Sequence, residues 1–163
     1  VNIYVWIMRG TPLLVQLIII FYALPMVGLT LPRFLAALVA FVLNYAAYYA
    51  EIFRGGINAI PKGQLEAAKV LKLTKWQTVR YVQIPQVMKI VLPSVFNEII
   101  TLVKDSSLIY VVGLGDLLRA GKIAMSRDVS LIPIMMAAMI YLILIGILTI
   151  LSKKIEQQFD YYK

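Results

Sequence analysis

Residues 129–152 read VSLIPIMMAAMIYLILIGILTILS, an apolar run without one charged side chain. A helix needs about 20 such residues to cross the hydrocarbon core of a bilayer. Residues 10–32 and 34–50 form two more uncharged runs, and a fourth apolar stretch over 85–103 carries few charges. These runs predict that much of the chain lies in lipid.

The composition supports the same conclusion. Of the 163 residues, 61% are hydrophobic and 15% charged, and the mean hydropathy is +0.85, whereas soluble domains are about 45–50% apolar and 25% charged. A soluble domain of this size buries too little of its surface to hide so much apolar area. Cysteine and histidine are both missing from the sequence, which excludes disulfide scaffolds, thiol chemistry, most zinc sites and histidine-based catalysis. We expect an all-α integral membrane protein without a metal or cofactor.

Four membrane helices follow from the runs: one ending near Pro25 and three over about 33–53, 85–103 and 131–151. The chain begins with Val and its first apolar stretch has no basic leader or cleavage site, so we do not expect a signal peptide.

The basic residues predict the orientation of these helices. The stretch from Arg54 to Lys89 carries one acid, Glu66, against seven basic residues: Arg54, Lys62, Lys69, Lys72, Lys75, Arg80 and Lys89. More lysines follow the last helix. The positive-inside rule assigns both regions to the cytoplasm. This topology explains the net charge of +8 and leaves no need for a nucleic-acid partner.

The cytoplasmic link over about 54–84 is the most informative segment. Gly55, Gly56 and Pro61 are expected to break helical structure, and Thr74 is expected to cap a short helix over 75–83. From composition alone, two roles for this helical pair are equally well supported. It could be an interfacial amphipathic element in contact with membrane lipid, or a docking element for a cytoplasmic partner.

Three motifs carry a resemblance to a known family. Residues 66–68 (EAA), followed at the family spacing by 82–85 (VQIP), resemble the EAA loop of ABC importer permeases, although Lys72 stands where that pattern has glycine. Residues 9–16 (RGTPLLVQ) and 44–56 (NYAAYYAEIFRGG) resemble the polar amino-acid uptake permeases. The Lys72 departure raises the question whether the tight turn at that place is kept.

The resemblance implies a single permease domain over 1–163, a five-helix core that here lacks its first helix, in a bacterial inner membrane. It implies a second permease copy, identical or not, an extracytoplasmic amino-acid-binding protein and cytoplasmic ATP-binding subunits. The residues expected to contact the ATP-binding subunit are Glu66, Ala67, Ala68, Leu71 and Lys72. The sequence has no GxxxxGK[ST] phosphate loop, so the chain is expected to be a transport subunit and not an enzyme.

A candidate carboxylate site lies near the start of the chain. Gly10 is expected to break the first helix, Thr11 to cap the next one and Pro12 to occupy its first position. A helix start with Arg9 beside it would hold an amino acid's carboxylate, as broken transporter helices do. If the span instead begins at Pro12, Arg9 is an ordinary basic flank.

Glu98 and Asp105 are the candidates for the positive groups of a ligand. They lie seven residues apart, on one face of a helix, and an ionisable side chain inside a membrane marks a functional site by default. Each also has a structural alternative: Glu98 as the partner of a base on another helix, and Asp105 as a solvated neighbour of Lys104. Asn44 and Tyr48 share a polar stripe on the second helix and are both candidate substrate contacts, with a clamp between two helices as the alternative role of Asn44.

Two acids against one base in this proposed site favour Arg, Lys or His as the substrate of an ATP-driven importer. A neutral polar amino acid such as Gln is the alternative substrate. A proton-coupled carrier and a non-transporting membrane anchor are the alternatives of a different class; a carrier has no need of an EAA loop, and an anchor has no need of polar residues at membrane depth.

Overall fold

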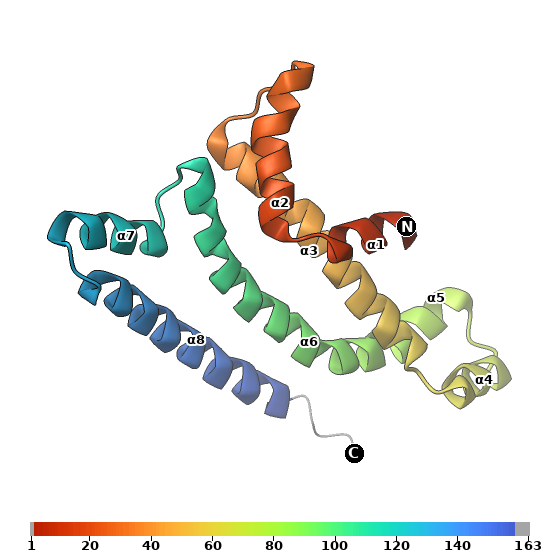
Figure 1. Cartoon of the computed structure of the whole chain (residues 1–163). Helices are drawn as coiled ribbons and strands as arrows, with labels where there is room; N and C mark the ends of the chain where they lie inside the picture. The colour runs from red at the N-terminus through yellow and green to blue at the C-terminus, as the bar shows by residue number, and fades with distance from the viewer. Residues whose placement is uncertain (1, 159–163) are drawn as a thin grey trace.

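The computed structural model describes residues 2–158, and every secondary-structure element within that range is a helix. Figure 1 shows an open arrangement of long helices joined by short ones, as predicted for an all-α chain. In chain order the elements are α1 (Asn2–Gly10), α2 (Leu13–Ile18), η1 (Ile19–Ala23), η2 (Leu24–Val27), α3 (Arg33–Asn58), α4 (Lys62–Val70), α5 (Lys75–Gln77), η3 (Thr78–Gln83), α6 (Ile84–Asp105), η4 (Ser106–Val112), α7 (Leu117–Asp128) and α8 (Ile132–Gln158).

The four predicted spans correspond to four stretches of the structure. α3, α8 and the continuous stretch from α5 to η4 are each long and apolar enough to cross a membrane, and α1 together with α2–η2 forms a bent pair that could make a fourth span. α3 and α8 run past the predicted ends near residues 53 and 151, to Asn58 and Gln158. The link between α3 and α6 and the end of α8 lie at the same end of the molecule (Figure 1).

Local sequence signals explain where several helices begin. Pro12, Pro32 and Pro61 each occupy the residue before a helix, with extended backbone, because the proline ring favours a helix start and disfavours a helix interior. Thr74 caps α5 as predicted: its side chain accepts a hydrogen bond from the backbone of Gln77, whose side chain accepts one from the backbone of Thr74. This capping box satisfies two backbone donors at the helix start.

The prediction that Gly55 and Gly56 break the helix is wrong. α3 continues through both residues to Asn58. Gly56 is buried against α6, and a Cβ atom there would overlap the side chain of Val91 and press on Val87. In membrane proteins small residues let helix backbones approach closely, so Gly56 permits the α3–α6 crossing.

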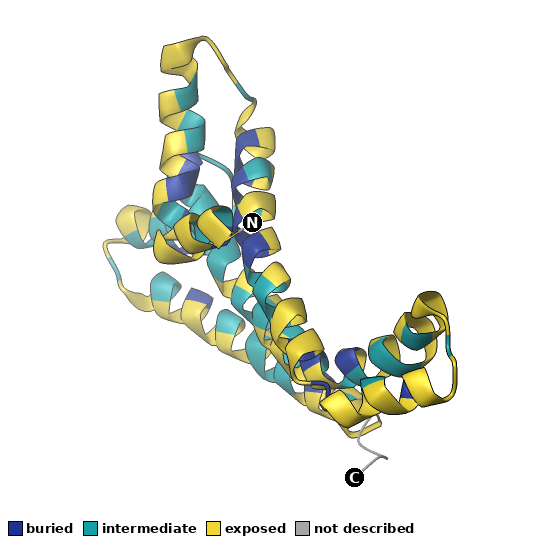
Figure 2. Ribbon diagram, turned by 90° about the vertical axis from the view of Figure 1, so that its right-hand side faces the viewer, coloured by how far each residue is buried: buried dark blue, intermediate teal, exposed yellow. Residues whose placement is uncertain are grey.

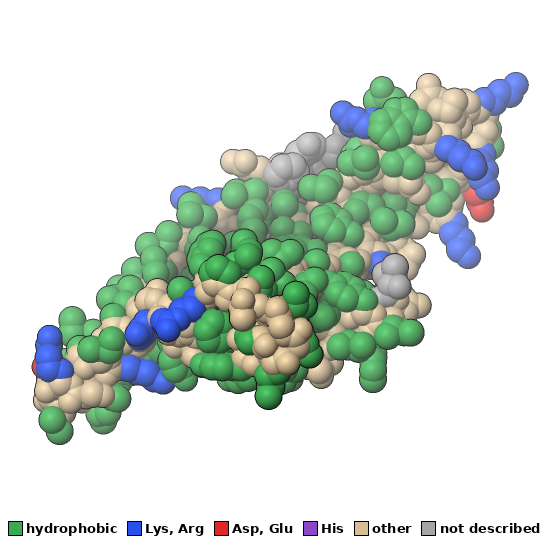
Figure 3. All heavy atoms as spheres, turned by 90° about the horizontal axis from the view of Figure 1, so that it is seen from above, with side chains coloured by type: hydrophobic (Ala, Val, Ile, Leu, Met, Phe, Trp, Pro, Cys, Tyr) green, Lys and Arg blue, Asp and Glu red, His purple; other side chains and the backbone are tan. Residues whose placement is uncertain are grey.

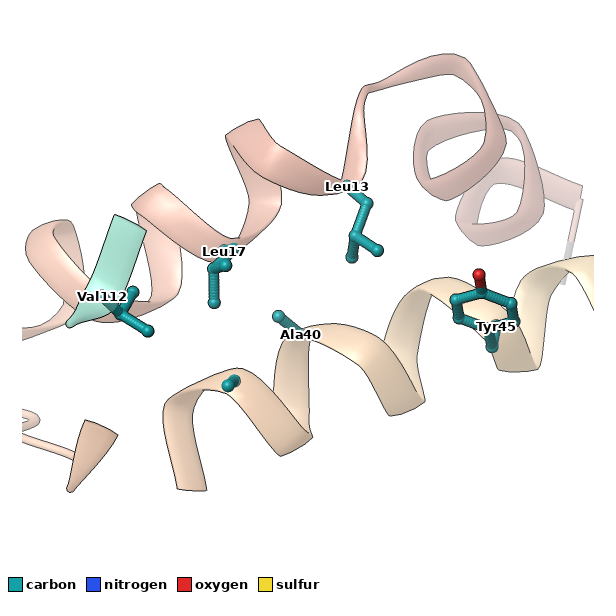
Figure 4. Close-up of a cluster of buried hydrophobic side chains, with 6 residues drawn as sticks. Leu13, Leu17, Ala40, Tyr45 and Val112 are labelled. Carbon is teal, nitrogen blue, oxygen red and sulfur yellow. The ribbon is translucent and has the colours of Figure 1, made fainter. Parts of the chain in front are cut away.

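The apolar core is small and lies where helices meet (Figure 2). The larger cluster packs α2 and the end of η4 onto α3, and in Figure 4 the side chains of Leu13, Leu17, Ala40 and Val112 point into this contact. A second cluster, Ile60, Val87 and Val91, packs the link that follows α3 onto α6. Hydrophobic side chains cover the middle of the face in Figure 3, and most lysines and arginines there lie toward its two ends. This distribution suits a chain surrounded by lipid.

A tight turn forms at Lys72, where the EAA pattern has glycine. The Lys72 backbone has φ of +54°, in the left-handed region, and the Leu73 amide donates to the carbonyl of Ala68, 3.0 Å away. This conformation costs a non-glycine residue roughly 1–2 kcal/mol. The turn is therefore formed by a residue poorly suited to it.

Replacing Lys72 with glycine is expected to stabilise the loop by about 0.5–1 kcal/mol, because relief of the left-handed strain exceeds the added freedom of the unfolded chain. Protection of the loop amides in hydrogen exchange measures this effect. Lys69→Gly, the same substitution within α4, should destabilise the loop by up to about 1 kcal/mol. If both variants stabilised the loop, or both destabilised it, the argument from backbone strain at Lys72 would be contradicted.

Candidate functional site

The bend between α1 and α2 is the centre of the site. The two helices meet at 99°, and the side-chain amide of Asn44 in α3 donates to the carbonyl of Met8 in α1 (3.1 Å). Asn44 lies about 16 Å from the start of α3 at 1.5 Å per residue, close to the middle of that helix. The chain therefore breaks beside the midpoint of a predicted membrane span.

Thr11 does not cap α2, contrary to the prediction. Pro12 occupies the capping position and α2 begins at Leu13 without a side-chain cap. The Thr11 hydroxyl instead donates to the carbonyl of Ile7, 2.8 Å away in α1. The residue before a proline disfavours helical backbone angles. Thr11 therefore lies outside α2, and its hydroxyl binds the last turn of α1 instead.

Gln16 in α2 forms hydrogen bonds across the bend. Sequence reasoning did not select it as a site residue. Its side-chain nitrogen donates to the carbonyl of Met8 (2.9 Å), the carbonyl of Thr11 (3.1 Å) and the Thr11 hydroxyl (2.8 Å). Its oxygen accepts from the Asn44 amide (3.0 Å). Gln16 and Asn44 are 8% and 4% exposed. The clamp between helices considered for Asn44 therefore exists, and Gln16 is its centre. The sequence could have indicated Gln16, because it is an amide side chain in an otherwise apolar, uncharged run.

A cavity of about 610 Å³ opens beside the bend; we call it the bend cavity. All six residues selected from the sequence as ligand contacts line it. Its lining comprises Arg9, Gly10, Thr11, Pro12, Leu13, Leu14, Asn44, Tyr45, Tyr48, Glu98, Thr101, Asp105 and Leu108. The structure thus brings together α1, α2, α3 and α6, whose contributions are far apart in sequence. Tyr45 and Thr101 are polar lining residues that the sequence did not indicate.

Arg9 supplies the positive charge of the cavity. Its guanidinium lies over the ring of Tyr48, 5.3 Å from the ring centre, in a cation–π arrangement. Its Nη1 is 3.8 Å from Oε2 of Glu51. Arg54 also binds Glu51.

The two carboxylates of the cavity have different surroundings. Asp105 accepts a hydrogen bond from the phenol of Tyr45 (2.8 Å), which ties the end of α6 to the middle of α3. Glu98 lines the same cavity as Asp105 and Arg9. Because Asp105 is oriented by Tyr45, Glu98 is the more available of the two for a ligand.

The loop residues selected as partner contacts divide into two groups. Glu66, Ala67, Leu71 and Lys72 are exposed, and Leu71 retains 72% of its accessible surface. Ala68 is 2% exposed and packs inside the loop. The exposed residues together form a partly apolar surface on α4 and the turn after it, while Ala68 supports the loop from within.

One family model, that of the binding-protein-dependent transport system inner membrane component, matches residues 1–160. The chain belongs to this family. Family membership makes it a transport permease subunit of the ABC type, an integral membrane protein, and implies ATP-binding and substrate-binding partners.

Individual relatives are similar over nearly the whole chain. The arginine transport system permease protein ArtQ of Bacillus subtilis is 41% identical, with 96% of this chain and 73% of ArtQ aligned. The putative glutamine transport system permease protein GlnP of Rickettsia conorii is 40% identical over the same shares. A crystal structure of an amino acid ABC transporter with histidines superposes with a TM-score of 0.89 at 39% identity, covering 96% of this chain and 74% of the other.

Proposed function

We propose that this chain is the permease subunit of an ATP-driven importer of basic amino acids. Its family membership and its similarity to permeases named for amino acids support the transport class. The observation that carries the substrate proposal is the bend cavity, in which one arginine and two carboxylates line the same space at the bend of a helix pair. A proton-coupled carrier or a membrane anchor would not need the EAA loop, and neither role agrees with membership of this permease family.

Each charged group of a basic amino acid has a counterpart in the cavity. Arg9, with Thr11 beside it, would bind the α-carboxylate, since arginine pairs with carboxylates through two parallel N–H donors. Glu98 and Asp105 would bind the α-ammonium and the side-chain cation. Asn44 and Tyr48 complete the lining, Tyr48 by supporting Arg9 and Asn44 by fixing the bend.

A neutral polar amino acid is the second candidate substrate. ArtQ and GlnP are named for arginine and glutamine and are almost equally similar to this chain. With glutamine as substrate, one carboxylate would serve the ammonium group and the other would be structural. The hydrogen bond from Tyr45 to Asp105 suits Asp105 for that structural part.

The link between α3 and α6 would couple transport to ATP hydrolysis. In this proposal the link and the C-terminus are cytoplasmic, and the exposed side of α4 docks into an ATP-binding subunit. The basic residues of the link support this orientation, as does its position at the same end of the molecule as the end of α8 (Figure 1). The opposite end, with α7, would face a binding protein that delivers the amino acid.

Glu98→Gln tests the substrate assignment. The substitution preserves shape and removes a charge, so binding of arginine should weaken by about 2–4 kcal/mol, the cost of breaking a desolvated charge pair. Binding of glutamine should weaken less than binding of arginine if Glu98 contacts the substrate side chain. Concentration-dependent uptake of both amino acids by the complete importer in proteoliposomes measures the difference.

Glu156→Gln on α8 makes the same chemical change away from the bend cavity and should leave uptake unchanged. Equal losses for arginine and glutamine would assign Glu98 to the shared ammonium group. Preferred uptake of glutamate or aspartate by the unmutated importer would refute the proposal for basic amino acids.

A further inference from the structure

Arg9 borders two more cavities besides the bend cavity. One, of about 340 Å³, lies between α3 and α6 and is also lined by Glu51 and Glu98. The other, of about 640 Å³, lies between α1 and α3 and is also lined by Glu51 and Arg54. Glu51 lines both of these and is absent from the lining of the bend cavity. Arg9 is therefore placed between the bend cavity on one side and a fixed carboxylate on the other.

Glu51 is bound unequally by its two arginines. Arg54, three residues later in α3, donates from Nη2 to both carboxylate oxygens at 2.7 and 2.6 Å and from Nε at 3.1 Å. Arg9 Nη1 is 3.8 Å from Oε2, beyond the distance of a hydrogen bond. Arg54 thus holds Glu51 in place, and Arg9 is attracted to Glu51 without being bonded to it.

This inequality lets Arg9 change partners at little cost. A carboxylate that loses its only cation is strongly destabilised when it is shielded from water. Glu51 retains Arg54 when Arg9 moves away, and Arg9 retains Glu51 and the Tyr48 ring when the bend cavity holds no anion. Neither charge is stranded in either arrangement.

We propose that Glu51 competes with the carboxylate of the transported amino acid for Arg9. This proposal rests on the proposed function, in which Arg9 binds that carboxylate. When the cavity is empty, Arg9 faces Glu51, and when an amino acid arrives its carboxylate takes Arg9 over. The competition weakens substrate binding and so assists release, because a transport pathway needs sites that bind a substrate and also let it leave.

Glu51→Gln is the direct test, with arginine and its α-amide as probes. The glutamine retains an oxygen that can accept from Arg54 and removes the charge that attracts Arg9. Arginine should then bind the assembled complex in detergent roughly two- to fivefold more tightly, in keeping with a partly exposed ion pair. Arginine amide has no carboxylate and retains both positive groups, so its affinity should stay the same or fall.

Glu156→Gln serves as the matched control, and neither probe should change its affinity. If arginine binds no more tightly to an assembled Glu51→Gln complex, or if the amide gains as much as arginine, the proposal is wrong. Should Glu51→Gln not assemble, Glu51→Asp makes the same comparison by withdrawing the carboxylate one methylene from Arg9. The proposed function fails separately, through an Arg9 variant that still transports at full rate.

Discussion

An Arg9→Ala variant is expected to lose amino-acid uptake almost completely while the importer still assembles. The Arg9 side chain is 42% exposed, so losing its charged hydrogen bonds to the substrate carboxylate should cost about 1.5–3 kcal/mol, which corresponds to a loss of roughly ten- to a hundredfold in affinity. Assembly should persist because Glu51 keeps its hydrogen bonds to Arg54. Initial uptake rates in proteoliposomes and co-purification of the subunits measure the two effects.

Two further variants make this result specific to Arg9. Arg9→Lys keeps the charge but loses the planar pair of donors, so intermediate uptake is expected. Lys154→Ala removes an exposed basic residue of α8, away from the bend cavity, and should leave uptake unchanged. Uptake by Arg9→Ala at the unmutated rate would make Arg9 a structural partner of Glu51 and remove the carboxylate site.

A bulky residue at Ala67 should uncouple ATP hydrolysis from uptake. Ala67 is exposed on α4 next to Glu66, and an added ring in a closely packed interface costs about 1–3 kcal/mol. Ala67→Phe is therefore expected to lower uptake per ATP hydrolysed by roughly five- to a hundredfold. Simultaneous measurement of phosphate release and uptake gives this ratio.

Ala67→Ser is the matched control, since it changes size very little and should preserve coupling. Ala68→Phe should act differently: because Ala68 is buried within the loop, this variant should disturb the loop itself and reduce assembly. Normal coupling in an assembled Ala67→Phe complex would show that this face of α4 does not contact the ATP-binding subunit.

The sequence predicted those parts of the fold that depend on one segment at a time. The uncharged run that becomes α8 and the threonine cap of α5 follow from bilayer thickness and helix-end chemistry. Gly56 was misinterpreted because glycine breaks exposed helices but lets packed membrane helices approach each other. Only the position of Val91 in another helix distinguishes the two cases.

The candidate site was predicted as a set of residues but without their pairing. Spacing placed Glu98 and Asp105 on one helical face, and both line the bend cavity. The partnership of Tyr45 with Asp105 joins helices that are distant in sequence, and no local pattern encodes such a contact. The role of Gln16 could have been suspected, since an amide among apolar residues must find a hydrogen-bond partner.

The hydrogen bonds of Gln16 and Asn44 determine how the bent helix pair can move. They join the Gln16 side chain in α2 to the carbonyls of Met8 in α1 and Thr11 in the link, and they join this group to Asn44 in α3. We therefore expect the angle between α1 and α2 to stay fixed. Opening the bend would break the hydrogen bonds of buried amide groups, at a free-energy cost of about 1–3 kcal/mol each. α1, α2 and α3 should consequently shift as one rigid body during transport, and the relative motion should fall at their contact with α6.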